Sequence, residues 1–307
     1  MAETGGEFGL IEWIRRRVSA HPALDTGIGD DAAVLNWPAE KALVTVDMLM
    51  EGVDFTFPEA SPEQVGRKAL AVNLSDIAAM GGKPVAAVVA VSLPRHRGTE
   101  LAQRLQQGIE QRAREFDVAL AGGDTNSWDG PLVISITVLG EPSARGPVRR
   151  SGARAGDWIL VTGEFGGSIA GRHLDFTPRV REGLLLAENF DVHAMIDVSD
   201  GLAADHHHIL DESRAGAALF GDQIPISAVA RATTDGKSAL EHALSDGEDF
   251  ELIFTVAPET AQALLAAPPF ETPLTHIGYI EPNPGCRLQS ADGSQRALPA
   301  LGWRHEL

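Results

Sequence analysis

Aspartates follow apolar segments at several points of the 307-residue chain, where together they could hold a cation. Each lies at or just beyond an apolar stretch or, in the first case, in a glycine-flanked loop: Asp31, Asp47, Asp76, Asp124, Asp197 and Asp200. Ligands collect at the carboxyl ends of strands in open α/β sheets, and converging carboxylates repel one another unless cations lie between them. Such hard oxygen ligands suit magnesium or calcium. A single aspartate is more often a cap or turn residue, so the prediction of a metal site depends on the whole set.

The charge balance sharpens this hypothesis. The chain has 25 Lys and Arg against 43 Asp and Glu, a formal net charge of −18. An acidic protein that binds a phosphorylated substrate must neutralise both sets of negative charge, and divalent cations held by aspartates can do so. The same charge argues against non-specific nucleic-acid binding, which requires a basic face.

Other candidate motifs are weaker. The single cysteine, Cys286, excludes an intramolecular disulfide and a thiolate metal site, and we expect it to be inert. The consecutive histidines 206–208 would point in three directions on a helix, which predicts a solvated helix surface. Residues 231–238 lack the first glycine of a P-loop, and the Gly-x-Gly-x-x-Ala pattern at 27–32 follows no buried strand. Neither predicts a nucleotide site.

Alternating helical and strand patterns predict an α/β arrangement that positions these residues. We expect helices at 7–18, 62–80 and 99–116, and strands at 42–46, 85–93, 118–121, 132–139, 158–162, 195–198 and 250–256. A glycine-, proline- and arginine-rich stretch at 140–157 predicts a connector, and the length is consistent with two domains, 1–142 and 143–307. No apolar run approaches the 18 or so residues that cross a bilayer, and the first segment resembles no signal peptide, so we expect a cytoplasmic protein.

The ordered motifs of the chain resemble the thiamine-monophosphate kinase family, which shares a superfamily with aminoimidazole ribonucleotide synthetase and selenophosphate synthetase. They span nearly the whole chain: Gly6-Glu-Phe-Gly-Leu-Ile, Gly27-Ile-Gly-Asp-Asp-Ala-Ala-Val, Lys68-Ala-Leu-Ala-Val-Asn-Leu-Ser-Asp-Ile-Ala-Ala-Met-Gly, Gly122-Gly-Asp-Thr, Asp197-Val-Ser-Asp-Gly-Leu and Gly247-Glu-Asp-Phe-Glu-Leu. Each motif alone is weak, whereas the ordered set is specific.

The resemblance implies a two-domain α/β fold of the aminoimidazole ribonucleotide synthetase-like type. In such a fold the N-terminal domains would pair into a dimeric β-barrel, and a C-terminal α/β domain would complete the site. It also implies the reaction, in which ATP phosphorylates thiamine monophosphate to thiamine diphosphate with the help of several Mg²⁺ ions.

Matching motif to motif assigns roles to individual residues. The metal ligands would be the six aspartates above together with Thr45. Nucleotide contacts would come from Gly123, Asp124, Arg150 and Ser199, and acceptor contacts from Asp54, Glu248 and Trp303. The chain departs from the family pattern at Val46, where a hydroxyl residue is usual, and at Asp54, which is often histidine.

Two alternatives remain open on the sequence alone. The first is another ATP-dependent synthetase of the superfamily, although selenophosphate synthetase needs a reactive Cys or selenocysteine near its N-terminus and this chain has none there. The second is a non-catalytic protein that binds a nucleotide or a metal and has kept the fold. A product assay with each substrate distinguishes the kinase from another synthetase. ATP binding without ADP release would favour the non-catalytic protein.

Overall fold

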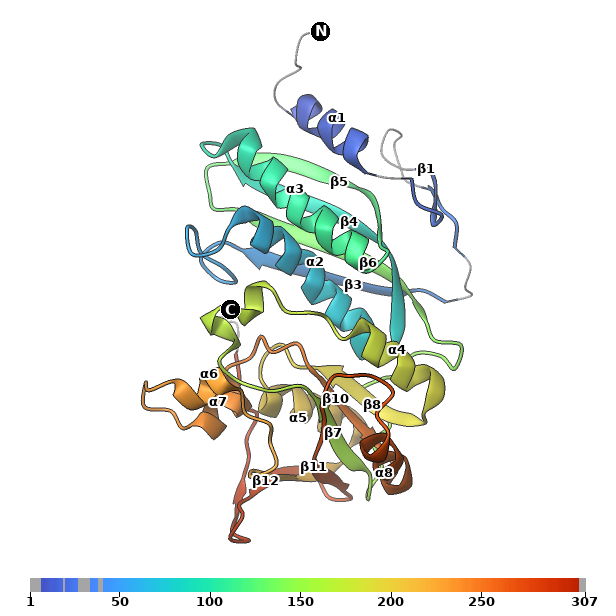
Figure 1. Ribbon diagram of the computed structural model, residues 1–307, viewed down its shortest axis with the longest axis vertical. Coiled ribbons are helices and arrows are strands. Elements are labelled where there is room, and N and C mark those ends of the chain that lie inside the picture. The colour runs from blue at the N-terminus through green and yellow to red at the C-terminus, as the bar shows by residue number, and fades with distance from the viewer. Residues whose placement is uncertain (1–6, 19, 27–33, 38–40, 304–307) are drawn as a thin grey trace. The chain divides into compact units, whose positions relative to one another are not determined.

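The computed structural model describes residues 7–18, 20–26, 34–37 and 41–303, and its chain divides into two compact units (Figure 1). Unit 1 comprises residues 1–77 and 83–141, and unit 2 comprises residues 78–82 and 142–307. Asp31 lies outside the described residues. Each unit is described below by itself.

Unit 1 is a four-stranded sheet with two long helices and a short hairpin. Its elements are α1 (Glu7–Arg17), β1 (Leu24–Thr26), β2 (Val34–Leu35), β3 (Leu43–Met50), α2 (Pro62–Ala79), β4 (Gly82–Pro94), α3 (Gly98–Glu115), β5 (Ala119–Trp128) and β6 (Val133–Pro142). The sheet has the order β3-β6-β4-β5 and is mixed, because β3 and β6 are antiparallel whereas β4 and β5 are parallel. It is open within the described part of the single chain, so the paired barrel stays a prediction.

The two faces of this sheet differ in their contact with solvent. Successive residues of a strand point to opposite faces, and β3 alternates between half-buried and exposed residues up to Met48. Thr45 and Asp47 therefore lie on one face, and Val44, Val46 and Met48 on the other, where each is more than 60% exposed. One face of the sheet is thus polar and partly covered near β3, and the other presents apolar side chains.

Two glycines allow the helices of unit 1 to touch backbone to backbone. A Cβ atom added at Gly66 of α2 would lie 2.1 Å from the carbonyl oxygen of Leu105, and one added at Gly108 of α3 would lie 2.0 Å from that of Glu63. No side chain fits at either position without moving a helix. This close approach fixes α2, which carries part of the candidate site.

Unit 2 is built on a seven-stranded mixed sheet. Its elements are β7 (Trp158–Thr162), the 3-10 helices η1 (Ser168–Ala170) and η2 (Arg172–Leu174), α4 (Val180–Asn189), β8 (Val192–Asp197), α5 (Leu202–Ser213), β9 (Gly216–Phe220), α6 (Ala228–Ala232), α7 (Ala239–Ser245), β10 (Leu252–Val256), α8 (Pro258–Ala266), β11 (Leu274–Glu281), β12 (Gly285–Gln289) and β13 (Gln295–Ala297). The strand order is β13-β12-β9-β11-β7-β10-β8.

Burial in unit 2 follows from how its strands are covered. All five residues of β10 are buried, as are the last four of β7, which is the pattern of strands packed on both faces. Helix α5 packs against β8 and α7, and α8 packs against β11 and β7. The buried face next to α5 and α7 joins residues such as Ile196, Leu202 and Leu244 in one core.

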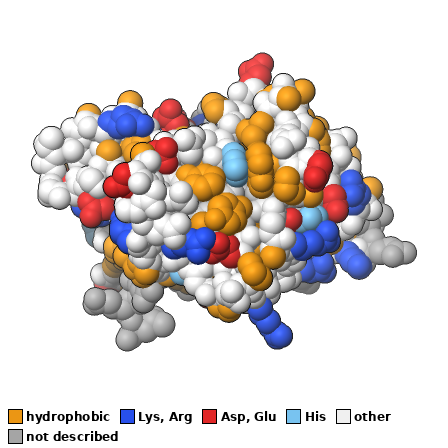
Figure 2. Space-filling model, turned by 90° about the horizontal axis from the view of Figure 1, so that it is seen from below, with side chains coloured by type: hydrophobic (Ala, Val, Ile, Leu, Met, Phe, Trp, Pro, Cys, Tyr) orange, Lys and Arg blue, Asp and Glu red, His pale blue; other side chains and the backbone are white. Residues whose placement is uncertain are grey.

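The face of the molecule in Figure 2 carries acidic, basic and apolar side chains. Hydrophobic side chains gather around a histidine on the face in Figure 2, with acidic and basic side chains interspersed. Among the described residues, no helix is long and apolar enough to cross a bilayer.

The contact between α2 and α3 yields a stability prediction. Replacing Gly108 with Ala puts a methyl group against the Glu63 carbonyl, so we expect the free energy of unfolding to fall by about 2 kcal/mol despite the better helix propensity of Ala. Urea denaturation measures this change. Gln107→Ala, at the adjacent exposed position of α3, is the matched control and should stay within about 0.5 kcal/mol of wild type. Equal free energies of unfolding for Gly108→Ala and Gln107→Ala would contradict the close approach of α2 and α3.

Candidate active site

A polar cluster in unit 1 joins β3 to α2. The Thr45 hydroxyl donates a hydrogen bond to Oδ2 of Asp76, and the Asp47 backbone N–H donates to Oδ1 of Asn73 at 3.2 Å. Thr45 and Asp47 are two residues apart on a strand, and Asn73 and Asp76 three apart on a helix, so each pair shares a face. Three predicted metal ligands thus lie together. Asn73 was missed from the sequence, although its position three residues before Asp76 was a signal.

Asn73 has a structural role in this cluster. Its side chain is fully buried, and its Nδ2 donates to the Ala69 carbonyl at 3.1 Å. That bond leaves Oδ1 directed at the Asp47 N–H, so the amide ties the strand to the helix. Asp47 is not at a strand end as expected, because β3 continues beyond it to Met50 through its pairing with β6.

Gly123 and Asp124 lie within β5, at the other edge of the sheet from β3. With two strands between them, β3 and β5 are separated by about 14 Å at the usual strand spacing. Asp124 is exposed, and the strand continues past it to Trp128, so this aspartate also was wrongly expected at a strand end. The strand pairing shifts between Ala87 and Val88, and a Cβ atom at Gly123 would lie 1.9 Å from the Val89 carbonyl oxygen. The irregular pairing therefore requires glycine at this position, whatever else Gly123 does.

The carboxylate of Asp54 closes the turn that follows β3. Its Oδ2 accepts the Met50 N–H at 2.6 Å, and its own carbonyl accepts the ammonium group of the fully buried Lys68 at 2.8 Å. Asp54 itself is half-buried. The structure thus gives this residue a local structural role beside the acceptor contact expected from the resemblance.

Five of the predicted residues gather in unit 2, around the turn that follows β8. Asp197 is buried at the last position of the strand, and Ser199 and Asp200 are half-buried in the turn. The Glu248 N–H donates to the Ser199 carbonyl at 2.7 Å, and the Trp303 N–H donates to the Asp200 carbonyl at 2.9 Å. Predicted metal, nucleotide and acceptor residues therefore share one hydrogen-bonded assembly.

A second bond extends the contact between these two segments. The Phe250 N–H donates to the Val198 carbonyl at 2.7 Å. A Cβ atom at Gly247 would lie 2.7 Å from the Ser199 carbonyl oxygen, so the two turns approach as closely as backbone permits. Trp303 is 55% exposed.

Asp205 of α5 anchors the turn that contains Asp200, and this role was not predicted from the sequence. One oxygen of its buried carboxylate accepts the N–H groups of Asp200 at 2.9 Å and Gly201 at 3.0 Å. Burial and repulsion from Asp197 and Asp200 raise the pKa of Asp205 to about 8. Ligand atoms of Asp200, Asp205 and the exposed His208 lie within 4.8 Å of one another. The turn therefore concentrates negative charge.

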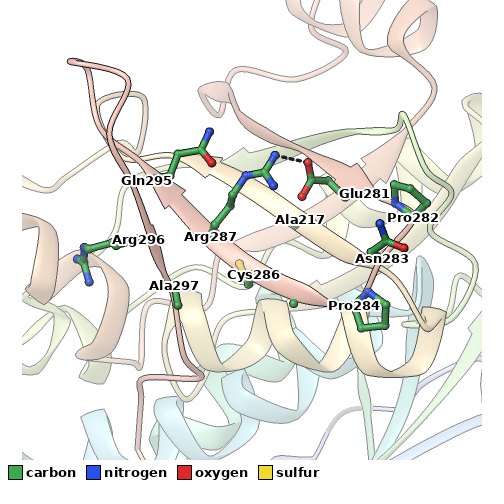
Figure 3. Close-up of a pocket in the computed structure, with 11 residues that line it drawn as sticks. Ala217, Glu281, Pro282, Asn283, Pro284, Cys286, Arg287, Gln295, Arg296 and Ala297 are labelled. Carbon is green, nitrogen blue, oxygen red and sulfur yellow. Dashed lines mark hydrogen bonds and ion pairs between the residues drawn. The ribbon is translucent and has the colours of Figure 1, made fainter.

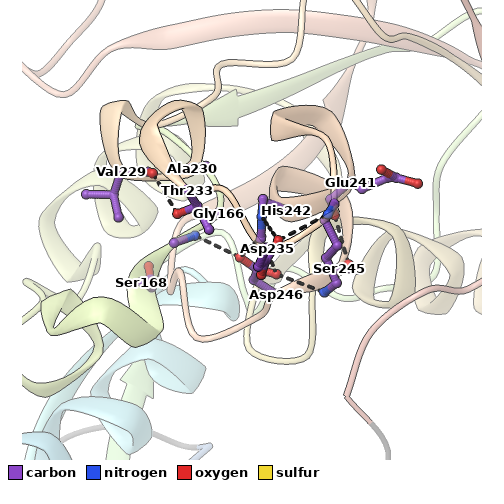
Figure 4. Close-up of polar contacts among 12 residues, drawn as sticks. Gly166, Ser168, Val229, Ala230, Thr233, Asp235, Glu241, His242, Ser245 and Asp246 are labelled. Atoms are coloured by element: carbon purple, nitrogen blue, oxygen red, sulfur yellow. Dashed lines mark hydrogen bonds and ion pairs between the residues drawn. The ribbon is translucent and has the colours of Figure 1, made fainter.

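The glycine-rich loop before η1 does not form a phosphate cradle. Its N–H groups point inward, because Gly166 donates to the buried carboxylate of Asp249 at 3.0 Å and Gly167 donates to Asp246 at 3.0 Å. Nδ1 of His242 contacts Asp246 at 2.8 Å, and its Nε2 contacts Asp235 at 3.2 Å (Figure 4). This loop is therefore held by carboxylates and supports the site indirectly.

Arg150 lies in the connector that precedes β7. Its side chain is exposed, and its carbonyl accepts the Ser213 hydroxyl at 3.1 Å. The same hydroxyl oxygen accepts the N–H groups of Gly152 and Ala153, both at 3.1 Å. Ser213, at the end of α5, thus fixes the backbone that presents the Arg150 side chain.

The three consecutive histidines point in different directions, as expected, but the predicted solvated surface is wrong for His206. His206 is fully buried, with Nδ1 at 3.9 Å from the sulfur of Cys286, whereas Nε2 of His207 contacts the Leu298 carbonyl at 2.8 Å. Burial lowers the pKa of His206 to about 3 and raises that of the Cys286 thiol to about 12. Cys286 lines a surface pocket beside Arg287 and Glu281 (Figure 3), and its neutral thiol agrees with the expected inertness.

The raised pKa of Asp205 predicts how stability depends on pH. The folded chain binds this proton more tightly than the unfolded chain, so the stabilisation is complete below about pH 4 and is lost as the pH rises to about 8. Asn at this position cannot ionise and keeps an oxygen for both N–H groups. We therefore expect metal-free Asp205→Asn to gain stability over wild type by up to about 1.4 kcal/mol per pH unit across this range.

Urea denaturation in EDTA between pH 5 and pH 8 measures this gain. Asp211→Asn, at an exposed position of the same helix, is the matched control and should show a constant difference from wild type. A pH-independent difference for Asp205→Asn would show that Asp205 is ionised throughout.

Known proteins resemble this chain over most of its length. Residues 29–141 match the family model for the AIR synthase related protein, N-terminal domain, and residues 154–290 match that for the C-terminal domain. The thiamine-monophosphate kinase of Rhodopirellula baltica is 44% identical over 284 residues, covering 89% of each chain. That of Salmonella typhimurium is 38% identical over 299 residues, covering 90% of each chain.

Solved structures are similar over nearly the full length. The crystal structure of thiamine-monophosphate kinase from Stenotrophomonas maltophilia has a TM-score of 0.81 at 36% identity and covers 94% of this chain and 97% of its own. A structure described as AaThiL complexed with AMPPCP and TMP has a TM-score of 0.77 at 30% identity, with coverages of 98% and 97%. The chain therefore belongs to the thiamine-monophosphate kinase family of enzymes, and it has the two-domain α/β fold of AIR synthase related proteins.

Proposed function

We propose that the chain transfers the γ-phosphoryl group of ATP to thiamine monophosphate, giving thiamine diphosphate and ADP. The observation that carries this proposal is the assembly in unit 2 around the turn that begins at Asp197. In this turn the carbonyls of Ser199 and Asp200 accept backbone hydrogen bonds from Glu248 and Trp303. Support also comes from the related structure with AMPPCP and TMP.

Magnesium fits the donor groups of both units. The proposed ligands all offer oxygen: Asp31, Thr45, Asp47, Asp76, Asp124, Asp197 and Asp200. The carboxylates around Asp205 support a cation in unit 2. Burial and then repulsion from Asp197 and Asp200 raise the pKa of Asp205 to about 8, and a positive ion would relieve the repulsion. When bound, Mg²⁺ would neutralise phosphate oxygens and the charge that develops during transfer.

Other residues would hold the two substrates. We assign Gly123, Asp124, Arg150 and Ser199 to the nucleotide, and Arg150 suits phosphate because its guanidinium gives paired, charge-assisted hydrogen bonds. For the acceptor, Trp303 would stack on a flat ring, Glu248 would accept a hydrogen bond from the aminopyrimidine, and Asp54 would complete the contacts.

The acceptor itself supplies the nucleophile. The second pKa of a phosphate monoester is about 6, so its oxygen is already ionised near neutral pH and needs no strong general base. This oxygen forms the new bond to the γ-phosphorus as the bond to the β–γ bridging oxygen breaks, and ADP leaves with that electron pair. The residues of the chain then act chiefly by aligning two anions in line.

A coupled assay for ADP release tests the function. With ATP and magnesium, we expect ADP and thiamine diphosphate to form with thiamine monophosphate, and neither to form with free thiamine, without acceptor or in EDTA. Asp76→Asn keeps an oxygen for Thr45 but weakens metal binding. Its turnover should fall by more than the 10- to 100-fold typical for loss of an outer-shell partner.

Asp129→Asn is the matched control, because its side chain is 89% exposed and pairs with Arg95 at the surface. Near-normal turnover in Asp76→Asn would contradict the metal assignment. ADP release only with another acceptor would favour a different synthetase. ATP binding with no turnover on any acceptor would favour a non-catalytic protein.

The cytoplasmic location stays a prediction.

We further propose that the chain is a homodimer formed by the apolar face of the unit 1 sheet. Val44, Val46 and Met48 are 64%, 61% and 61% exposed along one strand, and Val88 of β4 is 38% exposed. A row of exposed apolar side chains on a sheet is typical of an interaction surface. Pairing two such faces would bury these side chains and form the expected barrel.

The dimer proposal makes a prediction for Val46. A charge at this position would be buried without a partner in the interface, so Val46→Glu should shift the mass from twice 32.6 kDa to the monomer value in size-exclusion chromatography with light scattering. Val229→Glu, at a 47% exposed position of unit 2, is the matched control and should keep the wild-type mass. A monomeric wild type would refute the dimer.

A further inference from the structure

The turn that carries Glu248 has an unfavourable backbone conformation. Gly247, Glu248 and Phe250 have positive φ angles of 74°, 57° and 51°. For non-glycine residues this conformation is unfavourable, so surrounding contacts must hold the turn in place. Hydrogen bonds to the Asp197–Asp200 turn hold it from one side.

Arg172 holds the same turn from the other side. Its Nη2 donates to the Asp249 carbonyl at 2.9 Å and to Oδ1 of the Asp249 carboxylate at 3.2 Å. The same nitrogen donates to the Glu164 carbonyl at 3.2 Å, and Nε donates to the Ser168 hydroxyl oxygen at 3.1 Å. One guanidinium therefore ties the glycine-rich loop and η1 to the residue next to Glu248.

Asp249 completes a closed ring of hydrogen bonds. Asp249 is 2% exposed, and its carboxylate accepts the Ser168 hydroxyl at 2.6 Å and the Gly166 N–H at 3.0 Å. A buried carboxylate needs such partners, and bonds to charged groups are the strong ones. Removing Arg172 would leave the Asp249 carbonyl without this partner and weaken the ring at the turn itself.

A neighbouring arginine has a different role. Arg179 donates to both oxygens of Glu251, at 2.6 and 2.7 Å, and this carboxylate also accepts the Thr162 hydroxyl at 2.7 Å. That pair anchors the start of β10 rather than the turn. Arg172 is thus the arginine that contacts the backbone of the strained segment directly.

We propose that Arg172 is a positioning residue that holds the Gly247–Phe250 turn and thereby directs the Glu248 carboxylate at the thiamine monophosphate acceptor. The inference rests on the proposed function for the role of Glu248. It predicts that loss of Arg172 raises the KM for thiamine monophosphate more than the KM for ATP, because two hydrogen bonds of Arg172 go to Asp249, the residue next to Glu248.

The test compares steady-state kinetics of wild type, Arg172→Met and Arg172→Lys. We expect Arg172→Met to raise the KM for thiamine monophosphate about tenfold, with the KM for ATP within about twofold. The KM of Arg172→Lys for thiamine monophosphate should lie between those of wild type and Arg172→Met, because one ammonium group cannot replace the guanidinium fork. Arg181→Met, which removes an exposed arginine of α4, is the matched control and should match wild type. A lower melting temperature with an unchanged KM for the acceptor would overturn the proposal.

A double-mutant cycle with Glu248→Gln separates positioning from general support of the fold. If Arg172 acts through Glu248, Arg172→Met should raise the acceptor KM by less than twofold further in the Glu248→Gln background. A full tenfold rise in the acceptor KM in the Glu248→Gln background would overturn the proposal. If Arg172→Met does not fold, Arg172→Lys takes its place in the cycle.

Calorimetric titration distinguishes this proposal from the proposed function. Thiamine monophosphate is titrated into each variant with magnesium and without ATP, and Arg172→Met should weaken its binding about tenfold. A wild type that binds the acceptor but makes no thiamine diphosphate would refute the proposed function, and the titration would still decide the role of Arg172. Equal acceptor affinities of wild type and Arg172→Met would overturn the positioning role.

Discussion

Holding several carboxylates close together is the physical constraint on which the candidate site depends. Unpaired negative charges at short range repel, and burial makes each of them more costly. The chain balances these charges with different partners. Asp205 accepts two backbone N–H groups and, with its pKa raised to about 8, keeps its proton near neutral pH. An arginine fork binds Glu251, and a mixture of loop N–H, hydroxyl and guanidinium groups binds Asp249. For Asp197 and Asp200, Mg²⁺ and substrate would provide the balance under the proposed function.

This constraint links the fold to the site in both units. In unit 1, contact between helix backbones at Gly66 and Gly108 fixes α2, and Asn73 and Asp76 on that helix meet Asp47 and Thr45. In unit 2, backbone hydrogen bonds join the turn after β8 to the turn before β10 and to the C-terminal segment. Residues far apart in sequence therefore occupy fixed positions although several are on loops.

The sequence predicted most elements because their periodicity is local. The helix expected at 62–80 is α2, Pro62–Ala79, and the strand expected at 158–162 is β7 with the same bounds. Strand ends were less predictable, since pairing with a neighbour decides them. Gly122-Gly123 looked like the end of a strand, yet β5 continues to Trp128 along β4. The same effect placed Asp47 inside β3, whereas Asp197 does end its strand.

The sequence motifs predicted the candidate site residues but not the residues that hold them in place. Asn73, Asp205 and Arg172 were missed because their value depends on partners that only the fold brings near, such as Asp249, 77 positions from Arg172. His206 was misjudged for the same reason, since helical geometry gives its direction but not the presence of Cys286 beside it.

A crystal structure with Mg²⁺, a non-hydrolysable ATP analogue and thiamine monophosphate tests the central claim most directly. The account predicts carboxylate oxygens of Asp197 or Asp200 at about 2.1 Å from a magnesium ion, with the acceptor ring in contact with Trp303 and Glu248. Metal ions bound away from these aspartates, or an acceptor bound away from the turn at Glu248, would contradict it.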